Sequence, residues 1–307
     1  MNSLRISIVQ YLNTAPLVRG FTHGPLQGKY ALSFTVPSQC AEDLRSGTAD
    51  MAIIPAIEYQ RIENLVLLPG LSIASKYSVR SLLLLSKKPV REIASIALDR
   101  SSRSTQALTR ILCADHWGIS PEFFEAEPDL GAMLNQADAA LLIGDPALRH
   151  SYSIELDSNR DAAGGWTCPG AAVGLPSLES LHVYDVVEEW RAISKRPAVL
   201  AVWAARKDVV SPEVVRDFQD SLALGMRQLG EIAAEASAGL GLPAEVLRRY
   251  LSENIDYTLD KENLEGLGGY YLRAARLGLI PAVKPVAIAL TPSRPVIVHD
   301  FAAAKSR

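Results

Sequence analysis

The chain has 307 residues, of which 48% are hydrophobic, enough for one large or two medium domains with buried cores. Its 31 Lys and Arg residues against 34 Asp and Glu residues leave a formal net charge of −3. This balance argues against a nucleic acid or an anionic membrane as partner. The longest purely aliphatic run, Leu82–Leu85, is far too short to span a bilayer.

The cysteine and histidine residues show no pattern of a disulfide framework or a metal site. Cys40, Cys113 and Cys168 are odd in number and far apart, which predicts reduced thiols rather than a disulfide framework. The five histidines are scattered, without an HExxH motif or a Cys/His cluster, so we expect no metal site. The first residues lack the apolar core and cleavage site of a signal peptide, which predicts a cytoplasmic protein.

The first elements read as strand, polar turn, helix and strand. The apolar run ISIV ends at Val9 and leads into Tyr11-Leu12-Asn13-Thr14-Ala15-Pro16, where Asn13 can cap a helix that has Pro in its first turn. A second strand is predicted within 49–55. The run 81–86 reads as a further strand, and Lys87-Lys88-Pro89 as a linker that a proline ends.

The next part of the chain repeats this pattern. The strand-like run IASIAL ends at Leu98, and 137–143 reads Ala-Asp-Ala-Ala-Leu-Leu-Ile, much as 49–55 reads Ala-Asp-Met-Ala-Ile-Ile-Pro. Alternating strands and helices predict parallel sheets with right-handed crossovers. We interpret the repeat as two similar α/β lobes, although short apolar motifs can also resemble each other by chance.

A cluster of hydroxyl groups follows the strand that ends at Leu98. Ser101, Ser102, Ser104 and Thr105, together with Arg103, stand where this strand turns into a helix. Capping the helix is one explanation, since serine and threonine oxygens accept bonds from the first amides. An anion site at the positive end of the helix is the other. The residues alone leave both open.

Three further polar residues lie at strand ends. In the repeat, Asn13 falls opposite Ser102, at the carboxyl end of a first strand, where open α/β sheets bind ligands. Asp145, which precedes Pro146, is either a helix cap or a base facing the cleft. Ser81 has no obvious His and Asp partners, so we expect it to donate a hydrogen bond or orient the substrate rather than act as a nucleophile.

The last part of the chain is predicted to return to the first lobe. A strand at 198–203 follows Lys195-Arg196-Pro197, and amphipathic helices are predicted at 215–229, 243–254 and 263–279. We assign no role to the tail, 282–307. The predicted architecture is a two-lobed clamshell of the periplasmic-binding-protein type 2 kind, which closes over a small ligand. Its predicted parts are lobe one at 1–86 and 195–307, lobe two at 90–190, and crossings near 86–90 and 190–198.

Several motifs together resemble the chorismate dehydratase family of the futalosine route to menaquinone. The resemblance covers residues 4 to 280, and the motifs that carry it are Gln10-Tyr11-Leu12-Asn13 with Pro16-Leu17, Gly47-x-Ala49-Asp50, Ser78-Val79-Arg80-Ser81, Ser102-Arg103-Ser104-Thr105, Leu142-Ile143-Gly144-Asp145 and Ala201-Val202-Trp203-Ala204. The segments 185–189 and 194–198 depart from the family pattern. The 1,4-dihydroxy-6-naphthoate synthase of the same pathway and a non-catalytic small-carboxylate binding protein are the alternatives.

The resemblance implies a hydro-lyase that converts chorismate into 3-[(1-carboxyvinyl)oxy]benzoate without a cofactor. It implies catalytic roles for Asn13 and Ser81, and a carboxylate cradle at Ser102, Arg103, Ser104 and Thr105. Gly144 and Asp145 complete the expected substrate-binding set. The base stays open between Asp145 and the substrate's own carboxylate.

Overall fold

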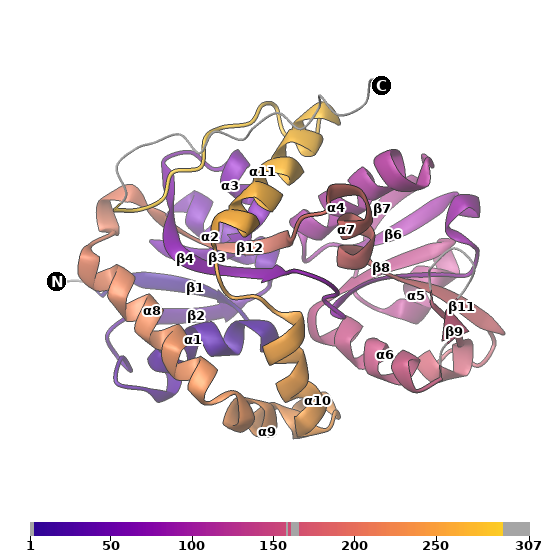
Figure 1. Cartoon of the computed structure of the whole chain (residues 1–307), viewed down its shortest axis with the longest axis horizontal. Helices are drawn as coiled ribbons and strands as arrows, with labels where there is room; N and C mark the ends of the chain where they lie inside the picture. Colours follow the sequence, from indigo (N-terminus) through magenta and orange to yellow (C-terminus); the bar gives the residue numbers. More distant parts are fainter. Residues whose placement is uncertain (1–2, 158, 161–165, 291–307) are drawn as a thin grey trace.

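Two α/β lobes lie side by side, each built around its own sheet (Figure 1). The computed structural model describes residues 3–157, 159–160 and 166–290. The first sheet has the strand order β2-β1-β3-β12-β4. Its strands are β1 (Arg5–Val9), β2 (Ala31–Thr35), β3 (Met51–Pro55), β4 (Leu65–Ser75) and β12 (Ala198–Arg206).

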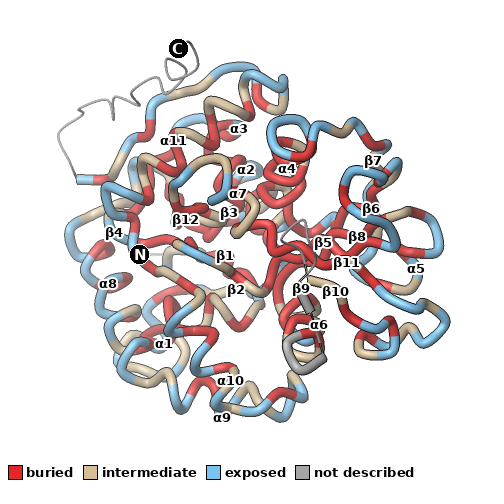
Figure 2. Tube along the Cα trace, turned by 45° about the vertical axis from the view of Figure 1, so that its right-hand side comes forward, coloured by how far each residue is buried: buried red, intermediate tan, exposed pale blue. Residues whose placement is uncertain are grey.

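The second sheet has the order β7-β6-β8-β5-β11-β10-β9. Its strands are β5 (Leu82–Ser86), β6 (Ser95–Asp99), β7 (Glu122–Ala126), β8 (Ala139–Ile143), β9 (Asn159–Arg160), β10 (Trp166–Pro169) and β11 (Ser180–Asp185). The apolar runs of β3, β5 and β8 are buried along their whole length, as expected for strands covered on both faces. Figure 2 shows the buried residues concentrated along both sheets.

The repeated sequence pattern corresponds to a repeated strand arrangement. In the first sheet β1 pairs in parallel with β2 and β3, and in the second sheet β6 pairs in parallel with β7 and β8. The prediction of parallel sheets is wrong for the remaining strands. β12 runs antiparallel to β3 and β4, and β5 runs antiparallel to β8 and β11. β5 and β12 are the first strands after a crossing between the lobes, and β4 is the last strand before one. None of them belongs to the repeated unit.

The predicted first crossing is also displaced. β5 belongs to the second sheet, so the chain leaves lobe one between β4 and β5, through residues 76–81, rather than near 86–90. Lys87-Lys88-Pro89 is a turn inside lobe two, between β5 and the short helix η2 (Val90–Glu92). The chain returns through residues 195–197, between a lobe-two helix and β12.

Helices cover both sheets. Those that follow strands of the first sheet or close the chain are α1 (Ala15–His23), α2 (Pro37–Ser46), α3 (Ala56–Arg61), α8 (Pro212–Arg227), α9 (Leu229–Leu240), α10 (Ala244–Arg249) and α11 (Lys261–Arg276). Those of the second lobe are α4 (Arg103–Leu112), α5 (Leu130–Gln136), α6 (Gly144–Asp157) and α7 (Val186–Ser194). The remaining short helical segments are η1 (Leu12–Thr14), η3 (Cys113–Trp117), η4 (Gly170–Val173), η5 (Lys207–Val209) and η6 (Tyr250–Asn254).

The helices predicted near the end of the chain are confirmed as α8, as α10 with η6, and as α11. Residues 282–290 then run back along lobe one, where Ile288 forms an isolated bridge with Leu67 of β4. The part of the tail from 291 onward lies outside the described residues. No helix within the described ranges is long and apolar enough to cross a membrane.

α1 and α8 approach each other very closely in lobe one. A Cβ added at Gly225 of α8 would lie 2.0 Å from the carbonyl oxygen of Pro16 in α1. One turn away, the buried Ser221 hydroxyl accepts a bond from the Gly20 amide and donates to the Leu17 carbonyl. The contact therefore needs glycine because backbone, rather than a movable side chain, occupies the space.

We expect Gly225→Ala to lower the free energy of unfolding by about 1–3 kcal/mol or more, because the methyl group must push the two helices apart. Gly230→Ala is the matched control, since a Cβ there meets nothing within 4 Å. It should leave stability unchanged or raise it by up to about 1 kcal/mol. Urea denaturation of both variants measures the difference, and equal stabilities would contradict the close packing.

Candidate active site

The predicted site residues at the end of β1 meet lobe two at the start of α6. The Leu12 amide in η1 donates to Oδ1 of Asp145 at 3.0 Å. Next to it, the Tyr11 ring packs so tightly on Gly144 that a Cβ there would lie 2.8 Å from ring atoms. Gly144 also has a positive φ of 63°, which favours glycine. The start of α6 is therefore shaped to receive the turn after β1.

Ser81 reaches the same region from the crossing segment. Its carbonyl oxygen accepts from the Gly144 amide at 2.8 Å, and its buried hydroxyl accepts a bond from the phenol of Tyr250 at 2.9 Å. Burial raises the pKa of Tyr250, while hydrogen bonding to Ser81 and Asn13 lowers it. The phenol of Tyr250 in η6 thus bonds directly to Ser81, and Asn13 lies near enough to affect its pKa. No sequence motif points to Tyr250.

A second polar chain connects Tyr11 with the end of β6. The Tyr11 hydroxyl lies 3.3 Å from the Ser101 hydroxyl, which donates to Oδ1 of Asp99 at 2.6 Å. Burial raises the pKa of the Asp99 carboxyl, and bonds from Ser101 and from the Ile143 amide oppose that shift. Burial likewise raises the pKa of Tyr11 to about 12. Ser101, rather than Ser102, is therefore the hydroxyl that meets the turn after β1.

The residues of the predicted carboxylate cradle have partners within the protein. Ser102 is the N-cap of α4 and lies 2.9 Å from the Thr105 hydroxyl, oxygen to oxygen. The Ser104 hydroxyl accepts from the Ile57 amide at 3.1 Å, and its carbonyl accepts from the phenol of Tyr270 at 3.0 Å. These contacts favour a capping and lobe-joining role, and the cradle stays a prediction.

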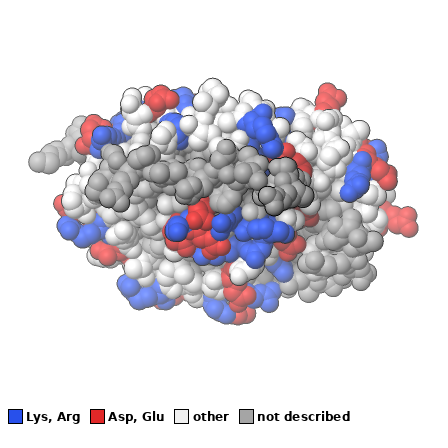
Figure 3. Space-filling view, turned by 45° about the horizontal axis from the view of Figure 1, so that its top comes forward, with Lys and Arg blue, Asp and Glu red and all other residues white. Residues whose placement is uncertain are grey.

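Arg103 pairs with carboxylates of lobe one. Its guanidinium lies 2.8 Å from Glu42 and 3.2 Å from Glu58, the carboxylate of which is fully buried. Glu58 also binds Arg45 and, at 2.8 Å, Arg61. Arg103 therefore fastens the start of α4 to α2 and α3. Acidic and basic side chains lie next to each other on the face that Figure 3 shows.

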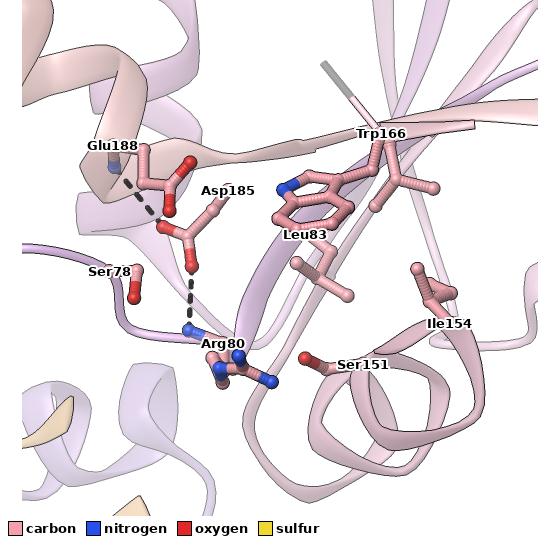
Figure 4. Close-up of a pocket in the computed structure, with 9 residues that line it drawn as sticks. Ser78, Arg80, Leu83, Ser151, Ile154, Trp166, Asp185 and Glu188 are labelled. Atoms are coloured by element: carbon pink, nitrogen blue, oxygen red, sulfur yellow. Dashed lines mark hydrogen bonds between the residues drawn. The ribbon is translucent and has the colours of Figure 1, made fainter. Parts of the chain in front are cut away.

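The backbone before Ser81 is fixed by a buried carboxylate (Figure 4). Oδ2 of Asp185 accepts from the amides of Val79 at 2.9 Å and Arg80 at 2.7 Å, and Oδ1 accepts from Val187 and Glu188 in the first turn of α7. Burial raises the pKa of Asp185 to about 6. Arg80 has a φ of 61°, a conformation that non-glycine residues seldom adopt.

A groove of about 430 Å³ adjoins the contact between the turn after β1 and the start of α6. Tyr11, Leu12 and Asp145 lie in its wall. Its other walls come from the end of β1, from α1, β2 and α9, and include Gln10, Val18, His23, Phe34, Ile232, Ala236 and Leu240. A smaller cavity of about 60 Å³ lies beside Asp185 and Trp166 (Figure 4). The groove is the better place for a small molecule, since binding sites are mostly apolar hollows with a few polar groups.

Within the part of the chain that is described, no group of three or more His, Cys, Asp or Glu side chains is arranged to hold a metal ion. The candidate site is built instead from hydroxyl, phenol, amide and single carboxyl groups. Such groups can orient a substrate, donate hydrogen bonds to a leaving oxygen and accept a proton.

Two lobes with a polar site between them define the class of a periplasmic-binding-protein-like fold, as predicted. Protein AF1704 from Archaeoglobus fulgidus is similar with a TM-score of 0.69 and 19% identity, over 91% of this chain and 98% of that one. The alkanesulfonate-binding protein SsuA from Xanthomonas axonopodis pv. citri, bound to MOPS, has a TM-score of 0.59 and 14% identity, over 91% and 94%.

Residues 4–276 match the family model described as menaquinone biosynthesis, and the chain belongs to that family. A curated relative, the chorismate dehydratase of Thermus thermophilus, is 28% identical over 277 residues, which cover 89% of this chain and 95% of the relative. The family predicted from the sequence motifs is confirmed.

The double variant Ser104→Ala, Thr105→Val separates the two roles of the hydroxyl cluster. We expect it to lower the free energy of unfolding by about 1–3 kcal/mol, because the buried Ile57 amide loses its acceptor. KM for chorismate should stay within about twofold, since these hydroxyls already have protein partners. Thermal melting and steady-state kinetics measure both quantities. A strongly raised KM with wild-type stability would show that the hydroxyls bind the substrate.

Proposed function

We propose that this protein is a chorismate dehydratase, which removes water from chorismate to give 3-[(1-carboxyvinyl)oxy]benzoate. The observation that carries the proposal is the convergence of Ser81, bonded to Tyr250, and the turn that carries Asn13, bonded to Asp145, at the boundary of the two lobes. These two residues come from segments far apart in the chain, and the family resemblance assigns them catalysis. The 28% identity to a chorismate dehydratase over most of the chain supports the same reaction.

The reaction needs no oxidant or reductant. The base takes the proton from ring carbon C3, the electrons of that C–H bond form the C3–C4 double bond, and the C4–O bond breaks. The departing hydroxide and the abstracted proton together make one water. Because the ring becomes aromatic, the reaction is strongly downhill. The protein's task is therefore to hold one geometry, which contributes about 7–11 kcal/mol in favourable cases, and to support the leaving oxygen.

Ser81 is suited to support the leaving oxygen. Its hydroxyl already accepts from Tyr250, so its own proton can point at a substrate oxygen. Asn13 holds either the leaving hydroxyl or the carboxylate of the enolpyruvyl group. The groove with Tyr11, Leu12 and Asp145 in its wall gives the ring a largely apolar place beside the turn that carries Asn13.

Asp145 is the base we propose within this chain. Its carboxyl is only partly buried, lines the groove and is oriented by the Leu12 amide on Oδ1. Burial raises its pKa above the ordinary aspartate value, which makes the ionised form a stronger proton acceptor. The substrate's own carboxylate is the competing base.

We expect Asn13→Ala and Ser81→Ala each to lower kcat at least about tenfold, equivalent to ~1.4 kcal/mol of transition-state stabilisation. Ser86→Ala is the matched control, because Ser86 is buried at the far end of β5, the strand that follows Ser81, and bonds to the Lys88 carbonyl. It should keep nearly wild-type kcat. Near-normal turnover of folded Asn13→Ala and Ser81→Ala would refute the site.

The pH profile tests Asp145. The base must be ionised, so kcat/KM should fall as the pH drops through its raised pKa, at a higher pH than for an ordinary aspartate. Asp145→Asn should lower the rate and abolish this acid limb. If the variant keeps both the rate and the limb, the substrate's carboxylate is the base.

A further inference from the structure

We propose that Tyr250 is a positioning residue for catalysis, which holds the Ser81 hydroxyl so that the serine proton faces the leaving oxygen of the substrate. The inference rests on the proposed dehydratase function. It adds a residue from the C-terminal helices to a site otherwise made by the turn after β1, the crossing segment and α6.

The geometry places Tyr250 in direct contact with one of the two candidate catalytic residues, Ser81. Its phenol donates to the Ser81 hydroxyl at 2.9 Å, and its environment includes the Asn13 side chain and the Asp145 carboxylate. The Tyr250 side chain is buried, so water does not compete for this bond. The segment η6 thus places the Tyr250 hydroxyl directly against the Ser81 hydroxyl.

The bond from Tyr250 matters because a serine hydroxyl has only one proton to donate. A serine hydroxyl has one proton and two acceptor lone pairs. The Tyr250 proton occupies one lone pair, so the serine proton is left to bond elsewhere. A hydroxyl that accepts a hydrogen bond also becomes a better donor, because bonds in a chain polarise one another. Tyr250 therefore fixes the direction of the Ser81 proton and strengthens it as a donor.

The hold of η6 on the crossing segment does not depend on this phenol. Four residues further on, the side-chain amide of Asn254 donates to the Ser78 carbonyl at 3.0 Å, and Asp256 exchanges backbone bonds with Ala74. These contacts anchor the segment to the end of β4 and the crossing. Removing the Tyr250 hydroxyl should therefore alter the Ser81 hydroxyl far more than the fold.

A nearby tyrosine supplies the matched control. Tyr257 is also buried, but its hydroxyl has no hydrogen-bond partner among the described residues. Tyr257→Phe and Tyr250→Phe each delete one buried hydroxyl and keep the ring. The first should leave the kinetics unchanged, and the second should lower kcat for chorismate about tenfold with KM little changed, because the lost bond acts on Ser81.

The test is a double-mutant cycle on purified protein with chorismate as substrate. In a Ser81→Ala background, Tyr250→Phe should cause no further loss of kcat, because the residue through which it acts is gone. A wild-type kcat in Tyr250→Phe, or an undiminished loss in the Ser81→Ala background, would overturn the inference while leaving the dehydratase function intact. If the wild-type protein itself does not convert chorismate, the proposed function fails, and this inference with it.

If Tyr250→Phe does not fold, a fluorinated tyrosine at position 250 provides a second test of the positioning role. The substitution retains ring and hydroxyl and makes the phenol a stronger donor. It should raise kcat and leave the melting temperature unchanged. An unchanged kcat in the folded variant would contradict the positioning role.

Discussion

The buried carboxylate of Asp185 is the contact on which the site depends. It gathers amides from two separate places, the crossing segment at Val79 and Arg80 and the first turn of α7. A buried carboxylate is costly unless it is hydrogen-bonded, so these four amides must stay in place. The left-handed backbone at Arg80 is held by this contact. Ser81 follows directly, so the same contacts hold the backbone next to it.

The remaining site contacts join the two lobes. The Leu12 amide of lobe one bonds to Asp145 of lobe two, and Arg103 of lobe two pairs with Glu58 of lobe one. A rotation that opened the clamshell would break the first contact and remove Asp145 from the turn that carries Asn13. In the proposed function, closure therefore assembles the site, and the buried Glu58 cluster keeps α4 against lobe one.

Much of the fold could be predicted because buried parallel strands leave apolar runs in the sequence. The repeat of Ala-Asp followed by such a run gave the two matching lobes, and strand ends pointed to Asn13, Ser81 and Asp145. The lobe of β5 could not be predicted in this way. Its four leucines indicate that the strand is buried, but the neighbouring sequence does not indicate which of the two sheets it joins.

Local sequence also fails to indicate residues that join the candidate site through long-range contacts. Tyr250 meets Ser81 across 169 positions and lies in a helical segment without a motif of its own. The hydroxyl cluster after β6 was ambiguous for a different reason, because capping and anion binding use the same groups. Only tertiary contacts show that Ser104 bonds to Ile57 and that Ser101 meets Tyr11.

The most direct test of the account is to mix the purified protein with chorismate, without added cofactor, and to follow the products by proton NMR. The account predicts aromatic ring signals together with retained enolpyruvyl vinyl signals, and one water released per chorismate consumed. Binding of chorismate without conversion would contradict it, and would leave a non-catalytic carboxylate-binding protein on the same fold.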